Sequence, residues 1–398
     1  MQTNHKILFQ QVVRFIAKKC KNLNRKAILL SLFMIVFSYC LSNFERPLFV
    51  ETKLLQVVSL AKNFITGGID TSENPDSIIF IDVSYDRDLI AIKENGIIKG
   101  NVDVTDKSKL ERFLRFIMDS NYKAVVLDID FSNKFFTKKD LVIADLINKM
   151  DNIYIAKGEN ITTSKISNKA YWVDHYVNAL DNSFTKVALE RNDTLSLPMK
   201  MYQDNSKVKL SNKWGLFYFA DGCLARRCIY PKMYIGSDIT SYSLGQELLN
   251  DSIYTPQEVQ TLVRNKLIFI GSVEGELDNY NTYNGEYPGN IINANIYLSL
   301  WNKAYKYPLW LIMVQFVLFY ICGVHMFQGS NANVKRPNTV SSLLRISSFV
   351  WFYYTAILAI VCIVIYLLFG EAYDILFSSA VLSIIHGVVK FFNHNQHE

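Results

Sequence analysis

Apolar residues gather in four long runs, one near the start of the chain and three near its end. The runs cover residues 27–44, 309–328, 346–369 and 372–392, and the last reaches this length only with its flanking residues. An α-helix rises about 1.5 Å per residue, so runs of this length suffice to cross roughly 30 Å of hydrocarbon. The pattern therefore predicts four transmembrane α-helices.

Residues 45–306, between the first two runs, have the mixed composition of a water-soluble domain. Two amphipathic segments, 108–121 and 138–150, predict helices with one apolar face. Short apolar runs around them are rich in Ile and Val and barely alternate with polar residues, as strands buried on both faces do. These runs cover residues 78–83, 124–129, 153–156 and 267–271. The order of strands and helices predicts an α/β domain with a mostly parallel sheet.

Residues 171–234 differ from the rest of this domain. Turn signals recur at 191–194, 205–207 and 221–222, which favours an antiparallel β insertion. At the edges of the domain, residues 44–65 predict a helix leaving the first apolar run, and residues 288–306 a helix leading to the second. The predicted fold class is thus an α/β extracytoplasmic domain plus four transmembrane α-helices.

Basic residues predict how the chain lies in the membrane. Residues 1–26 carry seven Lys and Arg and no acid, and the loop 329–345 carries three and no acid. Positively charged loops stay in the cytoplasm, so both termini, including the tail 393–398, are expected inside and residues 45–306 outside. The expected location is a bacterial inner (plasma) membrane, crossed several times.

The charge of the chain does not indicate a nucleic-acid partner. Residues 45–306 hold 31 Lys and Arg against 33 Asp and Glu, a net charge of −2, whereas the whole chain carries +6. The excess of positive charge therefore belongs to the membrane topology.

Two cysteines, Cys223 and Cys228, fall in the segment expected to face an oxidising compartment. A disulfide across a tight turn at 224–227 would join them. On one straight strand their odd separation would point them to opposite faces instead. The sequence leaves both alternatives open.

Enzyme functions find little support. The predicted outer domain has a single histidine, His175. A His-rich zinc site would lack its ligands, and a Ser/His/Asp triad would have only this one histidine to serve as its base. The chain lacks the usual phosphate-binding and nucleophile motifs. Asp128-Ile129-Asp130 resembles the nucleophile motif of haloacid-dehalogenase-type phosphatases, but the segment 271–278 lacks the later acid at the required place. We expect a protein that is not an enzyme.

Acidic side chains follow several of the predicted strands. In a parallel α/β sheet, ligands bind beyond the carboxyl ends of the strands, and a following helix offers free N–H groups. A cleft there would hold a cation on its carboxylates, or a polar ligand whose anionic part meets the helix N-terminus. The structural alternative is that these residues cap turns and hold loops. The candidate ligand-binding residues are Asp82, Asp128, Asp130, Arg227, Asp278, Gly289 and Asn293.

Six segments of the domain resemble a known family. They read IIFIDVSYD (78–86), KAVVLDIDF (123–131), KKDLVIADLI (138–147), ADGCLARRCIY (220–230), NKLIFIGSVEGELDNYNT (265–282) and YPGNIINANIYLSLW (287–301). The last two are the most specific, with a strand ending in Ile-Gly, a loop with an Asp, Pro-Gly and an Asn/Ala-rich helix. Over residues 44–301 the chain resembles CHASE domain family 2, extracytoplasmic sensory domains followed by three membrane helices.

The resemblance implies a sensor. Family members commonly continue into a cyclase or kinase, whereas this chain stops at Glu398, so the expected output is a separate cytoplasmic or membrane signalling protein. The stretch before Lys266 also looks shorter than in the family. Besides the lipid bilayer and that signalling protein, a homodimer is compatible with the sequence, and the expected cofactor is none beyond a cation in the acidic cleft. The alternative function is an envelope scaffold without a ligand.

Overall fold

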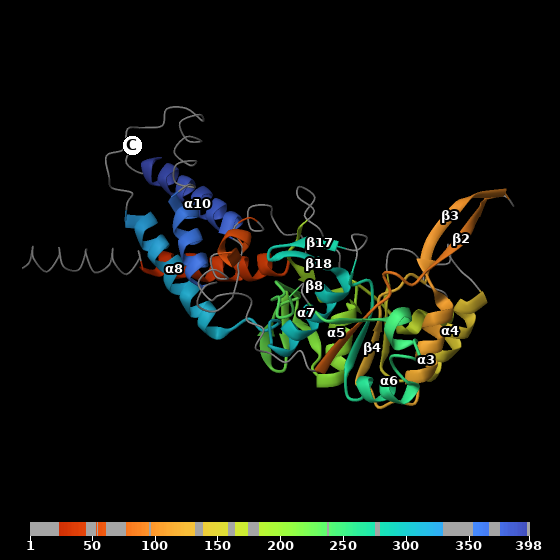
Figure 1. The fold of residues 1–398 in the computed structure, drawn as a ribbon. Helices are drawn as coiled ribbons and strands as arrows, with labels where there is room; N and C mark the ends of the chain where they lie inside the picture. The colour runs from red at the N-terminus through yellow and green to blue at the C-terminus, as the bar shows by residue number, and fades with distance from the viewer. Residues whose placement is uncertain are drawn as a thin grey trace, which may run out of the picture. The chain divides into compact units, whose positions relative to one another are not determined.

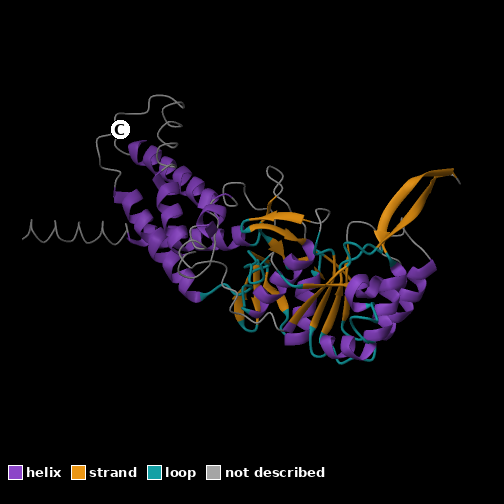
Figure 2. Cartoon of the chain, viewed as in Figure 1, coloured by secondary structure: helices purple, strands orange, loops and turns teal. Residues whose placement is uncertain are grey.

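The computed structural model describes residues 24–44, 53, 55–60, 77–94, 97–131, 138–157, 164–173, 183–236, 239–274, 279–328, 353–365 and 375–395. Contacts divide the chain into two compact units. We call Glu45–Lys306 the α/β unit, and Met1–Phe44 together with Tyr307–Glu398 the helical unit. Figures 1 and 2 show the mixed strands and helices of the first unit and the helices of the second.

The α/β unit is built on one six-stranded sheet in which every neighbouring pair is parallel. This confirms the predicted parallel sheet, and the four predicted apolar runs all form its strands. The strand order is β15 (Ser241–Ser243), β1 (Ile78–Asp82), β16 (Leu267–Gly271), β4 (Ala124–Leu127), β5 (Ile153–Lys157) and β6 (Ala170–Trp172).

One face of the sheet is covered by α3 (Lys107–Ile117), α4 (Lys138–Lys149), α6 (Pro256–Val263) and the short turn η4 (Leu244–Leu248). In α3 the apolar residues recur at helical spacing and all but Phe116 are buried against the sheet, while the Asp106 carboxylate accepts hydrogen bonds from the first-turn N–H groups. The buried residues of α3 include Leu110, Phe113, Leu114 and Ile117.

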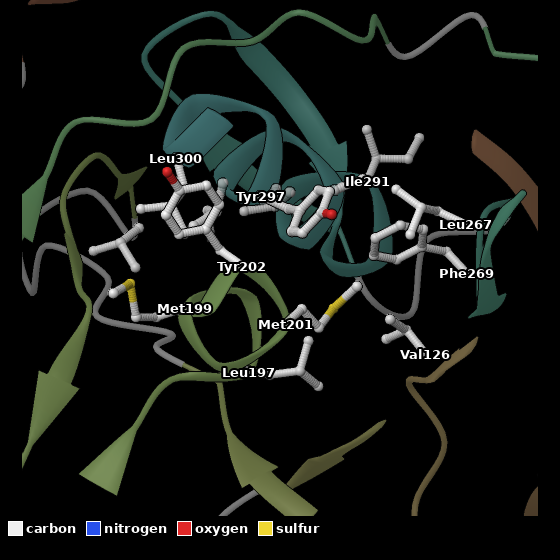
Figure 3. Close-up of a cluster of buried hydrophobic side chains, with 14 of the residues drawn as sticks. Val126, Leu197, Met199, Met201, Tyr202, Leu267, Phe269, Ile291, Tyr297 and Leu300 are labelled. Atoms are coloured by element: carbon white, nitrogen blue, oxygen red, sulfur yellow. The ribbon is translucent and has the colours of Figure 1, made fainter. Parts of the chain in front are cut away.

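The other face is covered by α7 (Gly289–Trp301) and α5 (Leu197–Ser206). Figure 3 shows Tyr297 and Leu300 of α7 close to Tyr202 of α5, and Ile291 beside the sheet residues Leu267 and Phe269. α7 is buried almost all round, which explains why its sequence is apolar on every side.

The segment 171–234 contains the expected antiparallel pairs, which confirms the β insertion. The pairs are β8 (Val187–Ala188) with β14 (Cys228–Ile229), β9 (Glu190–Arg191) with β10 (Thr194–Leu195), and β12 (Phe217–Ala220) with β11 (Leu210–Trp214) and β13 (Cys223–Ala225). A further small sheet joins β7 (Ser183–Phe184), β17 (Asn279–Thr282) and β18 (Gly285–Pro288). Cys223 is exposed and Cys228 buried, and no disulfide joins the two.

Several elements are absent from the sequence prediction. One is α5, which begins after Ser196 with a proline in its first turn. Another is a long antiparallel hairpin, β2 (Arg87–Glu94) and β3 (Ile97–Thr105), which projects from the unit in Figure 1. Leu89 on this hairpin is 74% exposed.

The helical unit contains two helices long and apolar enough to cross a membrane, Asn24–Ser42 and α8 (Leu309–Gln328). Two shorter apolar helices follow: Tyr353–Ile365, and the stretch Ser378–Val389 within α10 (Ile375–Asn395). The described residues thus give two of the four predicted spans by length and composition.

The connection between α7 and α8 is short and ordered. The helix predicted over 288–306 ends earlier, at Trp301, and Lys303 takes a left-handed conformation with φ 61°. Lys306 pairs with Ala225 of β13, and the Arg226 N–H donates to the Tyr305 carbonyl at 2.6 Å. Residues 302–308 therefore form a short, non-helical connection between α7 and α8.

Candidate functional site

The sheet changes the direction of its connections at β16. The chain leaves β16 towards α7 on one face, whereas the chain after the flanking strands β1 and β4 leads to α3 and α4 on the other face. In open parallel sheets, ligands bind outside the carboxyl ends of strands where such a reversal occurs. The candidate site is therefore the carboxyl edge formed by β1, β16 and β4.

Three residues form a row across this edge. Asp82 at the end of β1 pairs with Gly271 at the end of β16, and the Asp128 N–H donates to Ile270 at 2.8 Å. Because strand side chains alternate, Asp82 shares its face with Phe80, and Asp128 shares its face with Val126. Phe80 and Val126 both belong to the core beneath α7. The structure thus brings two predicted acids to one side of the sheet.

Asp82 holds two loops together. Its Oδ1 atom accepts hydrogen bonds from the backbone N–H groups of Ser84 at 3.0 Å, Val273 at 2.9 Å and Glu274 at 3.4 Å. The Ser84 hydroxyl also donates to it at 2.5 Å. Since Asp82 is only 3% exposed, it ties the loop after β1 to the loop after β16. This is the loop-holding role that the sequence left as an alternative.

Asp128 meets the first turns of α7. The Asn293 side-chain amide donates to Asp128 Oδ2 at 3.3 Å. A Cβ atom placed on Gly271 would lie 3.0 Å from Asp128 Cβ and 3.1 Å from Asn290 Nδ2. Glycine at 271 therefore lets the asparagine and the aspartate approach the strand end together, and Gly289 opens the helix that carries both asparagines.

Asn290 is the unusual residue of the site. It is fully buried, yet within the described residues neither its Nδ2 nor its Oδ1 atom has a hydrogen-bond partner. The Asn293 Oδ1 atom is in the same condition across the described chain. Buried polar atoms are nearly always paired, and leaving one unpaired costs roughly 1–3 kcal/mol. These three atoms therefore indicate a place for a bound polar molecule.

The N-terminus of α7 adds to this polarity. Its N-cap is Pro288, which makes no side-chain cap hydrogen bond. First-turn N–H groups of a helix carry a partial positive charge. Carboxylates, amides and a helix N-terminus thus converge at one edge, an arrangement suited to recognising a small polar molecule by hydrogen bonds.

Asp130 belongs to a different cluster. Its backbone oxygen accepts a hydrogen bond from Lys107 Nζ at 2.9 Å, and its own side chain is exposed. Lys107 also pairs with Asp140 at 3.5 Å and lies 4.1 Å from the centre of the Phe131 ring. Burial lowers the pKa of the Lys107 ammonium, while the charges of Asp140 and Asp130 act in the opposite direction. This cluster joins α3, α4 and the segment after β4.

Arg227 and Asp278 complete the predicted set. Arg227 Nε donates to the Glu190 carbonyl at 2.8 Å, which places it on the antiparallel part of the unit. Asp278 lies outside the described residues. The structure therefore gathers Asp82, Asp128, Gly289 and Asn293 at one edge, and places the side chains of Asp130 and Arg227 elsewhere.

Sequence reasoning missed Asn290 and Lys107. The helix 289–301 is apolar except for a few residues that include three asparagines in six positions, Asn290, Asn293 and Asn295, a signal that would have identified Asn290. Asn295 has a structural role, because its Oδ1 atom accepts from the N–H groups of Tyr234 and Ile235, both at 2.8 Å. Lys107 gave no comparable signal, since a lysine beside an N-cap is ordinarily solvated.

Among the described residues, no group of three or more His, Cys, Asp or Glu side chains lies close enough to hold a metal ion.

The fold and the edge define a parallel α/β domain with a polar strand-end site, placed in the chain between apolar helices. A family model for the CHASE2 domain matches residues 81–327. The chain therefore belongs to the CHASE2 family, a family of extracytoplasmic sensory domains. The match starts later than the expected resemblance and extends through most of α8. Comparisons with curated proteins and with solved structures found no match.

Proposed function

We propose that this protein is a membrane-anchored extracytoplasmic sensor. It binds a small polar ligand at the carboxyl edge of β1, β16 and β4 and passes the signal through its membrane helices to a separate partner protein. It acts by binding and not by catalysis. The observation that carries the proposal is the buried Asn290 amide, which lacks a partner in the described structure at the edge where parallel sheets bind ligands.

Packing in the helical unit supports four antiparallel spans. Helix Asn24–Ser42 meets α8 at both ends: Lys26 Nζ lies 5.9 Å from the centre of the Phe327 ring, and the Tyr39 and Tyr307 ring centres are 5.3 Å apart. The two helices therefore run in opposite directions. This geometry suits a chain that leaves the membrane into the α/β unit and returns from it on the same side.

The other two helices join this pair through polar contacts. His325 of α8 stacks on Tyr353 with ring centres 6.0 Å apart, and Tyr354 hydrogen-bonds His386 Nδ1 at 2.9 Å. Ser38 and Ser378 hydroxyls are 3.3 Å apart. Hydrogen bonds between buried side chains are a common means of association between helices in lipid. We infer that all four helices span the membrane with both termini in the cytoplasm.

The chain connects the ligand edge with the membrane by a short path. α7 carries Asn290 and Asn293 in its first turns, and residues 302–308 link its end to α8. Ligand binding that prefers one position of α7 would shift the population of conformations around this link. A receiving protein, or a second copy of the chain, would read that shift from the apolar surface of the helices.

The proposed topology is tested by reporter insertion. A reporter placed at the exposed turn between β11 and β12, at Gly215, should be active only outside the cytoplasm. A reporter after Glu398 should be active only inside. An external signal from the second reporter would exclude the four-span arrangement.

Transmission is tested by disulfide trapping in membranes that contain a variant of the chain without its native cysteines. Ser38→Cys and Ser378→Cys would place two thiols where hydroxyls now lie 3.3 Å apart. Asn290→Ala should change their rate of disulfide formation, whereas the control Asn101→Ala, an exposed residue of β3, should not. Equal rates in all three backgrounds would show that the edge and the membrane helices are not coupled.

A scaffold function is the second candidate, and the β2–β3 hairpin is the observation that favours it. Ile90 pairs with Val102 across this ribbon, and Leu89 is 74% exposed. An exposed apolar ribbon is a common protein contact. A scaffold would lose its partner on Leu89→Asp and be insensitive to Asn290→Ala, the reverse of a sensor.

A further inference from the structure

We propose that the ligand at this edge is a small molecule with a primary ammonium group and an oxygen acceptor on the adjacent carbon, as in an α-amino acid or a 1,2-amino alcohol. This inference rests on the proposed sensor function and names the ligand class of the same site. It follows from the hydrogen-bonding groups that the edge leaves unfilled.

Two of the three buried asparagine atoms without a hydrogen-bond partner in the described chain are acceptors. Asn290 Oδ1 and Asn293 Oδ1 are both buried and, in the described chain, both lack a donor. Asn290 and Asn293 are three positions apart, so their side chains project from one face of α7. The Asn293 Nδ2 atom already donates to Asp128 at 3.3 Å, which fixes the orientation of that amide and leaves its oxygen to accept. A ligand group with several N–H donors would satisfy both of these amide oxygens.

Charge selects an ammonium group among such donors. The sheet contributes two carboxylates to this edge, Asp82 and Asp128, and the charge of Asp82 is held inside the loops by backbone N–H donors. Asp128 lies beside Asn290 and Asn293, because Asp128 Cβ and Asn290 Nδ2 both come within about 3 Å of the position of a Cβ on Gly271. A cationic group next to Asp128 gains an opposite charge, whereas an anionic group at the same place would be repelled.

The remaining unfilled group sets the second requirement. Asn290 Nδ2 is a donor without an acceptor in the described chain, and it belongs to the same amide as Asn290 Oδ1. If the ligand's ammonium group donates to Asn290 Oδ1, an oxygen atom of the same ligand must accept from Asn290 Nδ2. The two atoms of one amide are close, so the ligand groups must sit on adjacent carbons. An α-amino carboxylate and a 1,2-amino alcohol share this geometry.

A single water molecule is the competing occupant. It would donate to the two amide oxygens and accept from Asn290 Nδ2, which satisfies the same three atoms. Water does not use the negative charge of Asp128, and it does not distinguish one added solute from another. The two occupants therefore predict different results when solutes are compared.

Access also has a consequence. The unfilled atoms of Asn290 are closed to solvent, so a ligand enters only if the strand-end loops move. Asp82 bridges those loops through Ser84 and Val273. Ligand entry should therefore be slow and accompanied by a change in the loops, which fits a site that reports occupancy.

The experiment compares five probes on the full chain in lipid nanodiscs by isothermal titration calorimetry: glycine, ethanolamine, ethylamine, acetate and inorganic phosphate. Glycine or ethanolamine should bind, and ethylamine should bind at least tenfold more weakly because it lacks the oxygen. Acetate and phosphate should not bind. The stronger of the first two probes identifies the acceptor as carboxylate or hydroxyl.

Variants locate the binding. Asn290→Ala should abolish it, Asn290→Asp should weaken it at least tenfold because the carboxylate lacks the N–H donor, and Asn101→Ala should bind as the wild type does. The proposal is overturned if acetate or phosphate binds more tightly than the amines, or if none of the probes binds, the result that a resident water predicts.

This result separates from that of the sensor test. Disulfide rates that respond to Asn290→Ala without binding of any probe would reject the ligand class and leave the sensor standing. Probe binding that leaves those rates unchanged would confirm the ligand class and reject the transmission.

Discussion

The Asn290 side-chain nitrogen lies 3.1 Å from the position that a Cβ atom on Gly271 would occupy. Asn290 lies at the start of α7, and Gly271 at the end of the central strand β16. A Cβ atom at position 271 would be closer to Asn290 than an ordinary van der Waals contact allows, and it would lie 3.0 Å from the Asp128 Cβ atom. Position 271 thus accommodates no side chain while α7 keeps its present distance from the strand.

Replacing Gly271 with alanine should lower the stability of the α/β unit. The new methyl group must push the buried Asn290 amide or Asp128 aside, and such overpacking costs about 1–3 kcal/mol. The midpoint of thermal unfolding of the purified chain should fall. Gly100→Ala is the matched control, because nothing lies within 4 Å of a Cβ there. Equal midpoints for the two variants would mean that the edge yields freely.

Asp82→Ala should also destabilise this unit, by about 1–3 kcal/mol, because it removes the acceptor of the Ser84 and Val273 N–H groups. Asp82→Asn retains an oxygen at this position and should lose less. Chemical denaturation of both variants measures the difference, with the exposed residue Asp88→Ala as the control. A loss as large for asparagine as for alanine would assign the effect to the charge and not to the acceptor.

The core of the fold was predictable where local sequence determines burial. The strands at 78–83 and 267–271 are recognisable as continuous apolar runs, because a strand covered on both faces need not alternate apolar and polar residues. The β2–β3 hairpin was missed because its apolar residues are interrupted by charges such as Lys93 and by Gly100. α5 was missed although Ser196 and Pro198 are ordinary signs of a helix start.

The site was only partly predictable for a different reason. Asp128 and Asp130 both follow β4, but one side chain meets Asn293 of α7 while the carbonyl of the other meets Lys107 of α3. Which face a residue meets depends on where the helices pack, and no local pattern contains that information. The same holds for Asn290, whose importance lies in what fails to contact it in the described chain.

Cys223 should report the side of the membrane on which the α/β unit lies. It is exposed, whereas Cys228 is buried. In sealed right-side-out vesicles, a membrane-impermeant maleimide should label the wild type, and Cys223→Ser should remove that label. Cys228→Ser should leave it unchanged. Labelling of Cys223 only in inside-out vesicles would reverse the proposed orientation.

Lys107 should make the stability of the α/β unit depend on alkaline pH. Burial lowers its pKa in the folded state below the ordinary value of 10.5. Between the two pKa values the unfolded chain binds more protons, so the contribution of Lys107 to stability rises with pH in that window. The unfolding midpoint of the wild type should therefore gain on that of Lys107→Met as the pH rises towards 10.5.

At neutral pH the same variant should be less stable than the wild type by about 3 kcal/mol, because it leaves Asp140 buried without its lysine. Lys149→Met, at an exposed position of α4, is the control and should show neither effect. A difference between wild type and Lys107→Met that shrinks as the pH rises would contradict the direction of the pKa change.

Gly323 should set the distance between α8 and the first apolar helix. A Cβ atom on Gly323 would lie 3.1 Å from Ala27 Cα and 3.3 Å from a methyl carbon of Leu30. The nearest obstacle is backbone, which cannot turn away as a side chain does. Small residues allow such close approach of helices in lipid, where packing and not water drives association. Gly323→Leu should therefore separate the two helices and cost about 1–3 kcal/mol.

Gly387→Leu is the control variant. With nothing within 4 Å of a Cβ at that position, it adds the same apolar volume without this clash. In mixed micelles, the unfolding midpoint should move to a lower fraction of sodium dodecyl sulfate for Gly323→Leu only. An equal shift for both variants would show that Ala27 and Gly323 do not form a close helix contact.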